Sequence, residues 1–198
     1  EALVEEHKEA NDLEGFRMDV LKYFAVDFDI KEEDFQKTSA NNLTERLYKE
    51  VRDTFSRKTE TIAKQAFPVI KNVFEQRGEM FKNIVVPFTD GKRAYNVVAN
   101  LEKTYKSEGE ELIRAYEKSI MLAHIDDAWK EHLREMDDLK QSVQNATYEQ
   151  KDPLLIYKFE SFNLFKSMVD KINKNVVSTL MKGQIPFEAP EEVKQAEE

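Results

Sequence analysis

Cysteine is absent from the 198-residue sequence, which excludes disulfides, thiolate zinc sites and cysteine nucleophiles within it. Glycine and proline are scarce, with five residues each, and this scarcity disfavours a turn-rich β fold. No apolar run approaches the roughly 20 residues that a transmembrane helix needs, and no signal peptide is visible. Acidic residues outnumber basic residues by 39 to 30, so the net charge is −9. Nucleic acid is therefore not an expected partner, because phosphate contacts need a basic face.

Helix-forming residues dominate what is present. Charged residues make up 35% and hydrophobic residues 40% of the chain, which leaves enough apolar material for a core. Abundant Glu, Lys, Leu and Ala favour long helices, so we predict a mainly α fold. The first residue is Glu rather than Met, which indicates a processed chain or a piece of a longer one.

The N-terminal half shows two helical patterns. In the first, Phe16, Val20 and Phe24 share one face, and the acidic stretch 27–40 that follows predicts a turn with a short helix. From Asn42 a stronger pattern repeats every four residues, through Leu43, Leu47, Val51 and Phe55. Pro68 is expected to bend or restart this helix, because proline lacks the amide hydrogen that the helix requires.

A short β-rich segment, 84–98, interrupts the helical patterns. Asp90-Gly91 at its centre is a strong tight-turn signal, because glycine accepts a positive φ. Pro87 cannot donate to a β ladder, so we expect it on an edge. The segment therefore predicts a small β-hairpin attached to a helical body, since two strands alone are barely stable.

Two long helices are predicted in the C-terminal half, one from about Glu110 and one after a turn. The first carries an apolar stripe of Leu122, Ile125, Trp129, Leu133, Met136 and Val143. The second carries another, of Phe159, Phe162, Phe165, Val169, Ile172, Val176 and Leu180. Each helix of about 30 residues would be about 45 Å long. Because the connection is short, we expect an antiparallel helical hairpin whose Phe side chains and Trp129 belong to the core.

The turn between these helices, QNATYEQKDP at 144–153, has clear end signals. Asp152 can cap the second helix, Pro153 suits its first position, and Gly183 is a natural stop. Tyr148 is the one aromatic residue in the turn and belongs to neither stripe. It either folds back onto the helix ends or makes contacts from a protruding tip.

Motifs for catalysis or metal binding are weak. His124 and His132 lie eight residues apart on similar helix faces, but neither follows a Glu by three residues, as di-metal carboxylate bundles require. We expect these His to be surface or interhelix hydrogen-bonding groups. The sequence has no phosphate-binding GxxxxGKS or GxGxxG motif. The pair Asp126-Asp127 is expected to lie on the solvent-exposed face of its helix. No active site, metal or cofactor is therefore expected within this chain.

Three stretches resemble the C-terminal region of the SecA family, the ATPase motors of bacterial protein secretion. They are IDDAWKEHLREMDDLKQSV (125–143), YEQKDPLLIYKFESFNLF (148–165) and VVSTL (176–180), and NNLTERLYKEVRDTFSRK (41–58) is similar more loosely. The resemblance implies a helical wing region at 1–112 with an insertion at about 63–109.

The same resemblance implies a helical scaffold with a two-helix finger at 113–185, and the composition of 186–198 itself predicts a disordered tail. The expected fold is a long antiparallel helical hairpin packed with a helical wing that carries the small β-hairpin. The insertion matches nothing in the commonest family members, and its role stays open.

The resemblance also implies a function. In that family the tip of the finger lies at the cytoplasmic mouth of the SecY channel, where a Tyr contacts the preprotein. The positions that match this tip are Tyr148, Gln144, Asn145, Thr147, Gln150 and Lys151. The chain would be a non-catalytic portion of the motor, with ATP and Mg held by motor domains outside it, on the inner face of the plasma membrane.

The implied partners are SecY, preproteins and the other domains of the same SecA chain. Apolar surface left uncovered would favour dimerisation. One alternative is a free-standing helical scaffold or chaperone-like module that binds proteins through exposed helix faces. Another, a metal-dependent helical enzyme, is weakened by the missing ligand spacings.

Overall fold

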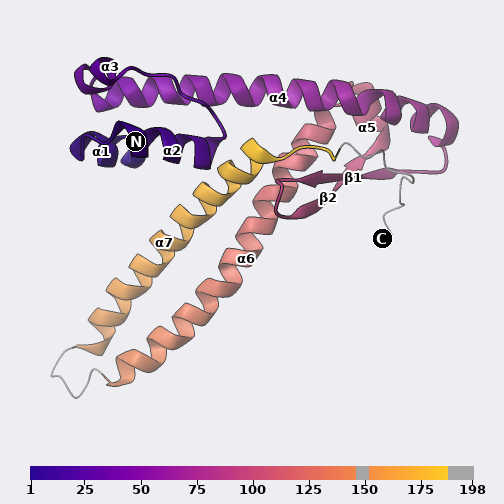
Figure 1. Cartoon of the computed structure of the whole chain (residues 1–198). Helices are drawn as coiled ribbons and strands as arrows, with labels where there is room; N and C mark the ends of the chain where they lie inside the picture. The colour runs from indigo at the N-terminus through magenta and orange to yellow at the C-terminus, as the bar shows by residue number, and fades with distance from the viewer. Residues whose placement is uncertain (146–151, 187–198) are drawn as a thin grey trace. The chain divides into compact units, whose positions relative to one another are not determined.

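The computed structural model describes residues 1–145 and 152–186, and the side chains of 144 and 145 lie outside that description. The predicted disordered tail, 186–198, falls outside it except for Pro186. Most of the described chain is helical, and the one sheet has two antiparallel strands (Figure 1). The mainly α fold with a β-hairpin is therefore confirmed. Its elements in order are α1 (Ala2–Glu9), α2 (Leu13–Phe24), α3 (Glu32–Lys37), α4 (Ala40–Arg77), β1 (Asn83–Thr89), β2 (Ala94–Asn100), α5 (Leu101–Lys106), α6 (Glu110–Asn145) and α7 (Pro153–Lys182).

The chain divides into two compact units. Unit 1 consists of Glu1–Ser119 with Val177–Glu198, and unit 2 consists of Ile120–Val176. Unit 1 holds α1 to α5, the β-hairpin, the start of α6 up to Ser119 and the end of α7 from Val177. Unit 2 holds the remaining parts of α6 and α7. The predicted boundaries of wing, scaffold and tail stay a prediction, since a compact unit is not a named domain.

The main core of unit 1 forms where α1, α2 and α3 pack beside the first half of α4. Phe16 is fully buried there, and its ring meets Phe28 edge-on at 5.9 Å and Phe35 at 5.4 Å between centroids. Such aromatic pairs add stability beyond the area that they bury. The buried core residues are Val4, Phe16, Val20, Val26, Phe28, Ile30, Phe35, Leu43, Leu47 and Met181.

Polar side chains close the loops around this core. The amine of Lys8 donates hydrogen bonds to the carbonyl oxygens of Phe35 at 2.6 Å and Thr38 at 2.7 Å, at the end of α3. A lysine suits this place, because the last carbonyls of a helix lack intrahelical donors. Arg17 likewise donates to the carbonyl of Ile30 at 2.7 Å. The irregular stretch predicted at 27–40 is thereby anchored, with α3 as its short helix.

Pro68 lies inside α4, which continues through it as a single helix. A restart at this proline, one of the two outcomes expected, is therefore wrong. The ring of Tyr105 on α5 stacks on Phe74 at 4.2 Å and lies 6.1 Å from Phe67, so one side chain contacts α4 on both sides of the proline. This packing offsets the missing hydrogen bond, as tertiary contacts commonly override local propensity.

The β-hairpin is confirmed. Strand β1 pairs with β2 in an antiparallel register that runs from Asn83 opposite Asn100 to Thr89 opposite Ala94. In the turn, the carboxylate of Asp90 accepts amide hydrogen bonds from Lys92 at 2.8 Å and Arg93 at 2.7 Å. Gly91 has φ +85°, which is strained for residues with a Cβ.

Candidate functional site: the helical hairpin and a cavity on α4

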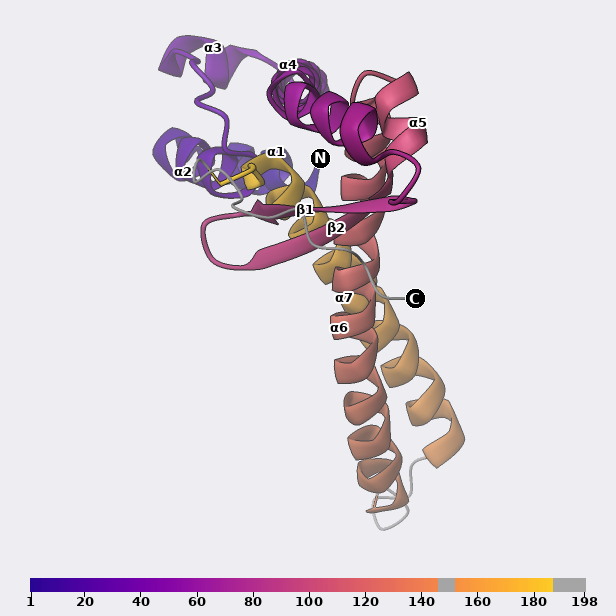
Figure 2. The same ribbon diagram turned by 90° about the vertical axis from the view of Figure 1, so that its right-hand side faces the viewer.

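The hairpin of unit 2 consists of α6 from residue 120 to Asn145 and α7 from Pro153 to residue 176. Figures 1 and 2 both show the two helices side by side and antiparallel, as predicted. Asp152 caps α7, because its carboxylate accepts a hydrogen bond from the amide of Leu154 at 2.9 Å. The predicted cap at Asp152 and start at Pro153 are therefore confirmed.

The predicted tip residues cannot be placed. Thr147, Tyr148, Gln150 and Lys151 lie outside the described residues. Gln144 and Asn145 end α6, but their side chains are also outside the description. The contact role of these side chains, and the choice between a folded-back and a protruding Tyr148, stay predictions.

The apolar stripe expected to form the hairpin core is largely exposed, and this corrects the sequence analysis. Leu122, Ile125 and Leu133 are 55%, 40% and 49% exposed. After residue 120, the buried positions of α6 are Ala128, His132 and Val143, of which only Val143 belongs to the predicted stripe. Two helices alone bury a narrow seam, whereas this apolar stripe is wider. Periodicity located an apolar face but not what covers it.

The aromatic residues of α7 were also expected in the core, and this expectation is wrong. Phe159, Phe162 and Phe165 are 63%, 66% and 48% exposed. The ring of Trp129 meets His132 on its own helix, at 5.6 Å, and His132 meets Phe165 edge-on at 6.0 Å. The aromatic contact across the hairpin thus passes through a histidine, and most of the phenylalanine surface stays open to solvent.

His132 therefore lies between the two helices through ring contacts, while the hydrogen-bonding role expected for it stays a prediction. It is buried, and its Nδ1 atom has no hydrogen-bond partner within the described residues. His124 is half-buried. Asp126 lies on the exposed face, paired with Lys130 at 2.6 Å, as expected for a solvated acidic face. In the part of the chain that the structure describes, no three His, Asp or Glu side chains gather closely enough to hold a metal ion.

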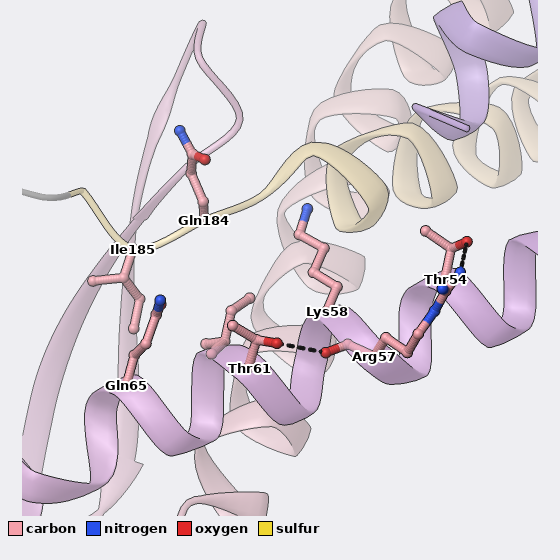
Figure 3. A pocket seen from close by; sticks show the side chains of 8 residues that line it. Thr54, Arg57, Lys58, Thr61, Gln65, Gln184 and Ile185 are labelled. Carbon is pink, nitrogen blue, oxygen red and sulfur yellow. Dashed lines mark hydrogen bonds between the residues drawn. The ribbon is translucent and has the colours of Figure 1, made fainter. Parts of the chain in front are cut away.

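A cavity of about 460 Å³ lies in unit 1 between α4 and the segment that follows α7. Figure 3 shows the side chains of α4 and those of Gln184 and Ile185 around it. The Arg57 guanidinium donates to the hydroxyl of Thr54 at 3.1 Å and lies 3.6 Å from the carboxylate of Glu50. The lining residues are Thr54, Arg57, Lys58, Thr61, Ile62, Gln65, Gln184 and Ile185.

Lys58 is the most perturbed group of this cavity. Its amine donates a hydrogen bond to the carbonyl oxygen of Met181, in the last turn of α7. Burial lowers the pKa of Lys58 to about 8, because a half-buried ammonium loses part of its hydration. Sequence reasoning missed this residue, although a signal existed. Lys58 occupies the apolar stripe of α4, three residues after Phe55 and four before Ile62.

Gly183 is held against the side chain of Tyr116 in the same unit. The Tyr116 hydroxyl donates to the carbonyl of Thr179 at 3.1 Å, and its ring stacks on Phe88 of β1 at 4.2 Å. Burial raises the pKa of this hydroxyl. A Cβ on Gly183 would lie 1.7 Å from the hydroxyl oxygen. The predicted helix stop is confirmed, since α7 ends at Lys182. Glycine is required here for space, and its φ is not in the left-handed region.

Comparison with known protein families identifies the family of the chain. A model described as the SecA wing and scaffold domain matches residues 1–184. The chain belongs to the SecA family. A SecA protein translocase subunit of Phocaeicola vulgatus is 50% identical over 188 residues, which cover 95% of this chain and 17% of the relative. The subunit of Bacteroides thetaiotaomicron is 52% identical over 188 residues, covering 94% and 17%. That of Flavobacterium psychrophilum is 48% identical over 186 residues, covering 94% and 17%.

The resemblance to SecA that the sequence motifs indicated is thereby confirmed, and residues 1–184 correspond to the wing and scaffold domain of this family. The chain spans about 17% of the length of these curated relatives. No solved structure matches the chain. Within residues 1–145 and 152–186, no helix combines the length and apolar character that crossing a membrane requires.

Proposed function

We propose that the hairpin of unit 2 is the two-helix finger of a SecA translocase. Its tip contacts the preprotein and the mouth of the SecY channel, and the finger couples ATP-driven motion of the motor to polypeptide export. The role of this segment is mechanical and binding, while ATP and Mg belong to the motor domains. The protein works at the cytoplasmic face of the plasma membrane, as a peripheral component.

The observation that carries this proposal is the pairing of two long helices with a short, capped connection. From residue 120 to Asn145, α6 is about 39 Å long, from 26 residues at 1.5 Å each. Asp152 stabilises the first turn of α7 beside the connection. A helix transmits displacement along its axis because its successive turns are joined by backbone hydrogen bonds that run nearly parallel to that axis. An aromatic residue at the tip, Tyr148, would contact varied side chains through non-directional apolar area.

The exposed apolar face of the hairpin supports a role in protein contacts. Trp129 is 46% exposed, Phe159 63% and Phe162 66%. Clusters of exposed apolar side chains commonly mark protein-interaction surfaces. Membership of the SecA family favours a translocase component over the free-standing scaffold that the sequence alone left open.

A disulfide crosslink tests the contact between tip and preprotein. The chain has no cysteine, so Tyr148→Cys gives this segment a single thiol. The variant segment would be placed in an otherwise cysteine-free, full-length SecA, with a stalled secretory substrate that carries one cysteine. We expect a disulfide with the substrate whose yield depends on the bound nucleotide.

Lys166→Cys is the matched control, because Lys166 is exposed on α7 away from the tip. It should give no substrate crosslink. If Tyr148→Cys couples only to SecY, or to nothing while translocation proceeds, then the tip does not act on the moving chain. The pushing contact would then lie elsewhere in the protein.

A further inference from the structure

The two edges of the small sheet differ in what they offer a partner. The hydrogen bonds at the ends of the hairpin establish which backbone groups point outward. Leu101 donates to the carbonyl of Lys82 at 3.0 Å, and Asp90 donates to that of Arg93 at 3.3 Å. In an antiparallel ladder such bonded pairs alternate with non-bonded pairs. The intervening non-bonded pairs, Asn83–Asn100, Val85–Val98, Pro87–Asn96 and Thr89–Ala94, therefore direct their amide and carbonyl groups to the outer edges.

The outer edge of β1 is already blocked. Thr89 exchanges two backbone hydrogen bonds of 2.8 Å with Gln184, which follows α7. Continued by two residues, this antiparallel register would place Pro186 opposite Pro87. Neither proline has an amide hydrogen to donate, so the pairing cannot extend there. Proline at an outward position is one of the usual protections of an edge strand.

The outer edge of β2 has no such protection. Asn96 and Val98 direct their backbone groups outward, both residues are exposed, and Val98 is 47% exposed. Neither has a backbone hydrogen-bond partner on that side among the described residues. Residues 94–100, AYNVVAN, contain no proline and no charge. Figures 1 and 2 both show β2 as the strand farther from α4.

We propose that β2 accepts an extended polypeptide segment as a third strand of the sheet. Spaced amide and carbonyl groups along one edge are complemented by another extended backbone, which is how β-strand addition gives affinity. One face of the sheet is buried, and β2 contributes Val97 and Ala99 to it. On this same face we expect the added strand to carry small apolar side chains, which would extend the buried surface.

The turn at one end of this edge carries Lys92 and Arg93 against the single carboxylate of Asp90, and β2 itself is uncharged. An incoming segment with a neutral centre and an acidic residue at the end that meets the turn therefore fits best. The proposed site consists of the β-hairpin alone, so the proposal does not depend on whether the helices of unit 2 act as a finger.

Amide hydrogen exchange by NMR tests the proposal directly in the full 198-residue chain. The probe is the acetylated and amidated peptide Glu-Val-Thr-Val-Thr-Val-Glu. At saturating peptide, we expect exchange of the Asn96 and Val98 amides to slow by about tenfold or more. The amides of Val97 and Ala99 already bond to β1 and should change little. The same peptide with N-methyl groups on the residues facing β2 should give no protection, because it lacks the donors.

A pair of variants at one position separates backbone pairing from side-chain contact. Val98→Pro removes an outward amide without removing a donor to β1, and it should weaken peptide binding about tenfold. Val98→Thr keeps the amide and a β-branched side chain, and it should bind within about threefold of the parent chain. Protected amides at Val97 and Ala99 verify that the hairpin is intact in each variant.

Three results would overturn the proposal. The first is no slowing at Asn96 and Val98 with millimolar peptide. The second is equal binding of the N-methylated peptide. The third is protection that rises with protein concentration in the absence of peptide, which would make a second copy of the chain the occupant of this edge.

Discussion

The two units of this chain are built from the same kind of amphipathic helix, yet they bury their apolar residues very differently. In unit 1, Phe16 is 0% exposed and lies among rings from α1, α3 and the loop between α2 and α3. In unit 2, Phe162 is 66% exposed and Trp129 is 46% exposed. The difference lies in the number of surrounding elements. The first half of α4 shares one core with residues of α1, α2 and α3, whereas the described residues of unit 2 form two helices.

This comparison shows that an apolar stripe does not by itself indicate a core. A stripe is buried only where enough neighbouring elements cover it, and the described residues of unit 2 contribute two helices to this cover. Its exposed face has the character of a surface that contacts other protein. In unit 1, side chains of the unit itself also bond the free carbonyls at helix ends. Lys8 donates to a carbonyl of α3, and Lys58 donates to a carbonyl in the last turn of α7.

The largest expected effect comes from one substitution made in each unit. Phe16→Ala should lower the free energy of unfolding by about 3–5 kcal/mol, because it removes a fully buried ring and leaves a cavity. Phe162→Ala should change it by less than about 0.5 kcal/mol. Urea denaturation followed by far-UV circular dichroism measures both. Fluorescence of Trp129, the one tryptophan, follows the hairpin separately, in case the units unfold in different transitions. Equal effects of the two substitutions would break the comparison.

An intermediate effect is expected where the chain returns to unit 1 after α7. Gly183→Ala should destabilise by about 1–3 kcal/mol, because its Cβ would overlap the Tyr116 hydroxyl. Tyr116→Phe removes that oxygen and should recover part of the loss in the double variant, so the two effects should not add. Thermal unfolding of the four proteins completes the cycle. Additive losses would show that backbone conformation, not this contact, requires the glycine.

The smallest effect at neutral pH is expected at Lys58. Lys58→Met removes one hydrogen bond to a carbonyl and also relieves the desolvation of the amine, for a net change of about 1 kcal/mol or less. The pH dependence is more telling. Because burial lowers the pKa of Lys58 to about 8, the unfolded chain binds more protons between that pH and the ordinary lysine value. The stability of the parent chain relative to Lys58→Met should therefore rise with pH through this window.

The control for this pH dependence is Lys64→Met, which removes an exposed lysine from the same helix. Its difference from the parent chain should stay nearly constant over the same range. A Lys58→Met difference that is flat, or that falls as the pH rises, would mean that the amine is no less hydrated in the fold than in the unfolded chain.

Much of the local structure could be predicted because its signals act over a few residues. Asp152 and Pro153 start α7, Gly91 turns the hairpin, and the four-residue repeat from Leu43 marks α4. Predictions failed where a distant segment decided the outcome. The helix continues through Pro68 because Tyr105 from α5 packs on both sides of it.

The candidate site was predicted unevenly for the same reason. The hairpin and its cap followed from periodicity and end signals, and the family followed from the motifs around Trp129 and Asp152. The cavity on α4 was missed, because it forms between segments far apart in the chain. Its residue Lys58 donates a hydrogen bond to the carbonyl of Met181, more than a hundred positions along the chain.

The sequence alone therefore determined the helical class, the β-hairpin, the ends of α7 and membership of the SecA family, since each depends on residue type and close spacing. Tertiary structure decided which apolar faces are buried, why Gly183 is a glycine, and which edge of the sheet stays open. These properties depend on contacts between segments far apart in the chain. Pro186 and Pro87, for example, block the β1 edge only because Gln184 returns to pair with Thr89.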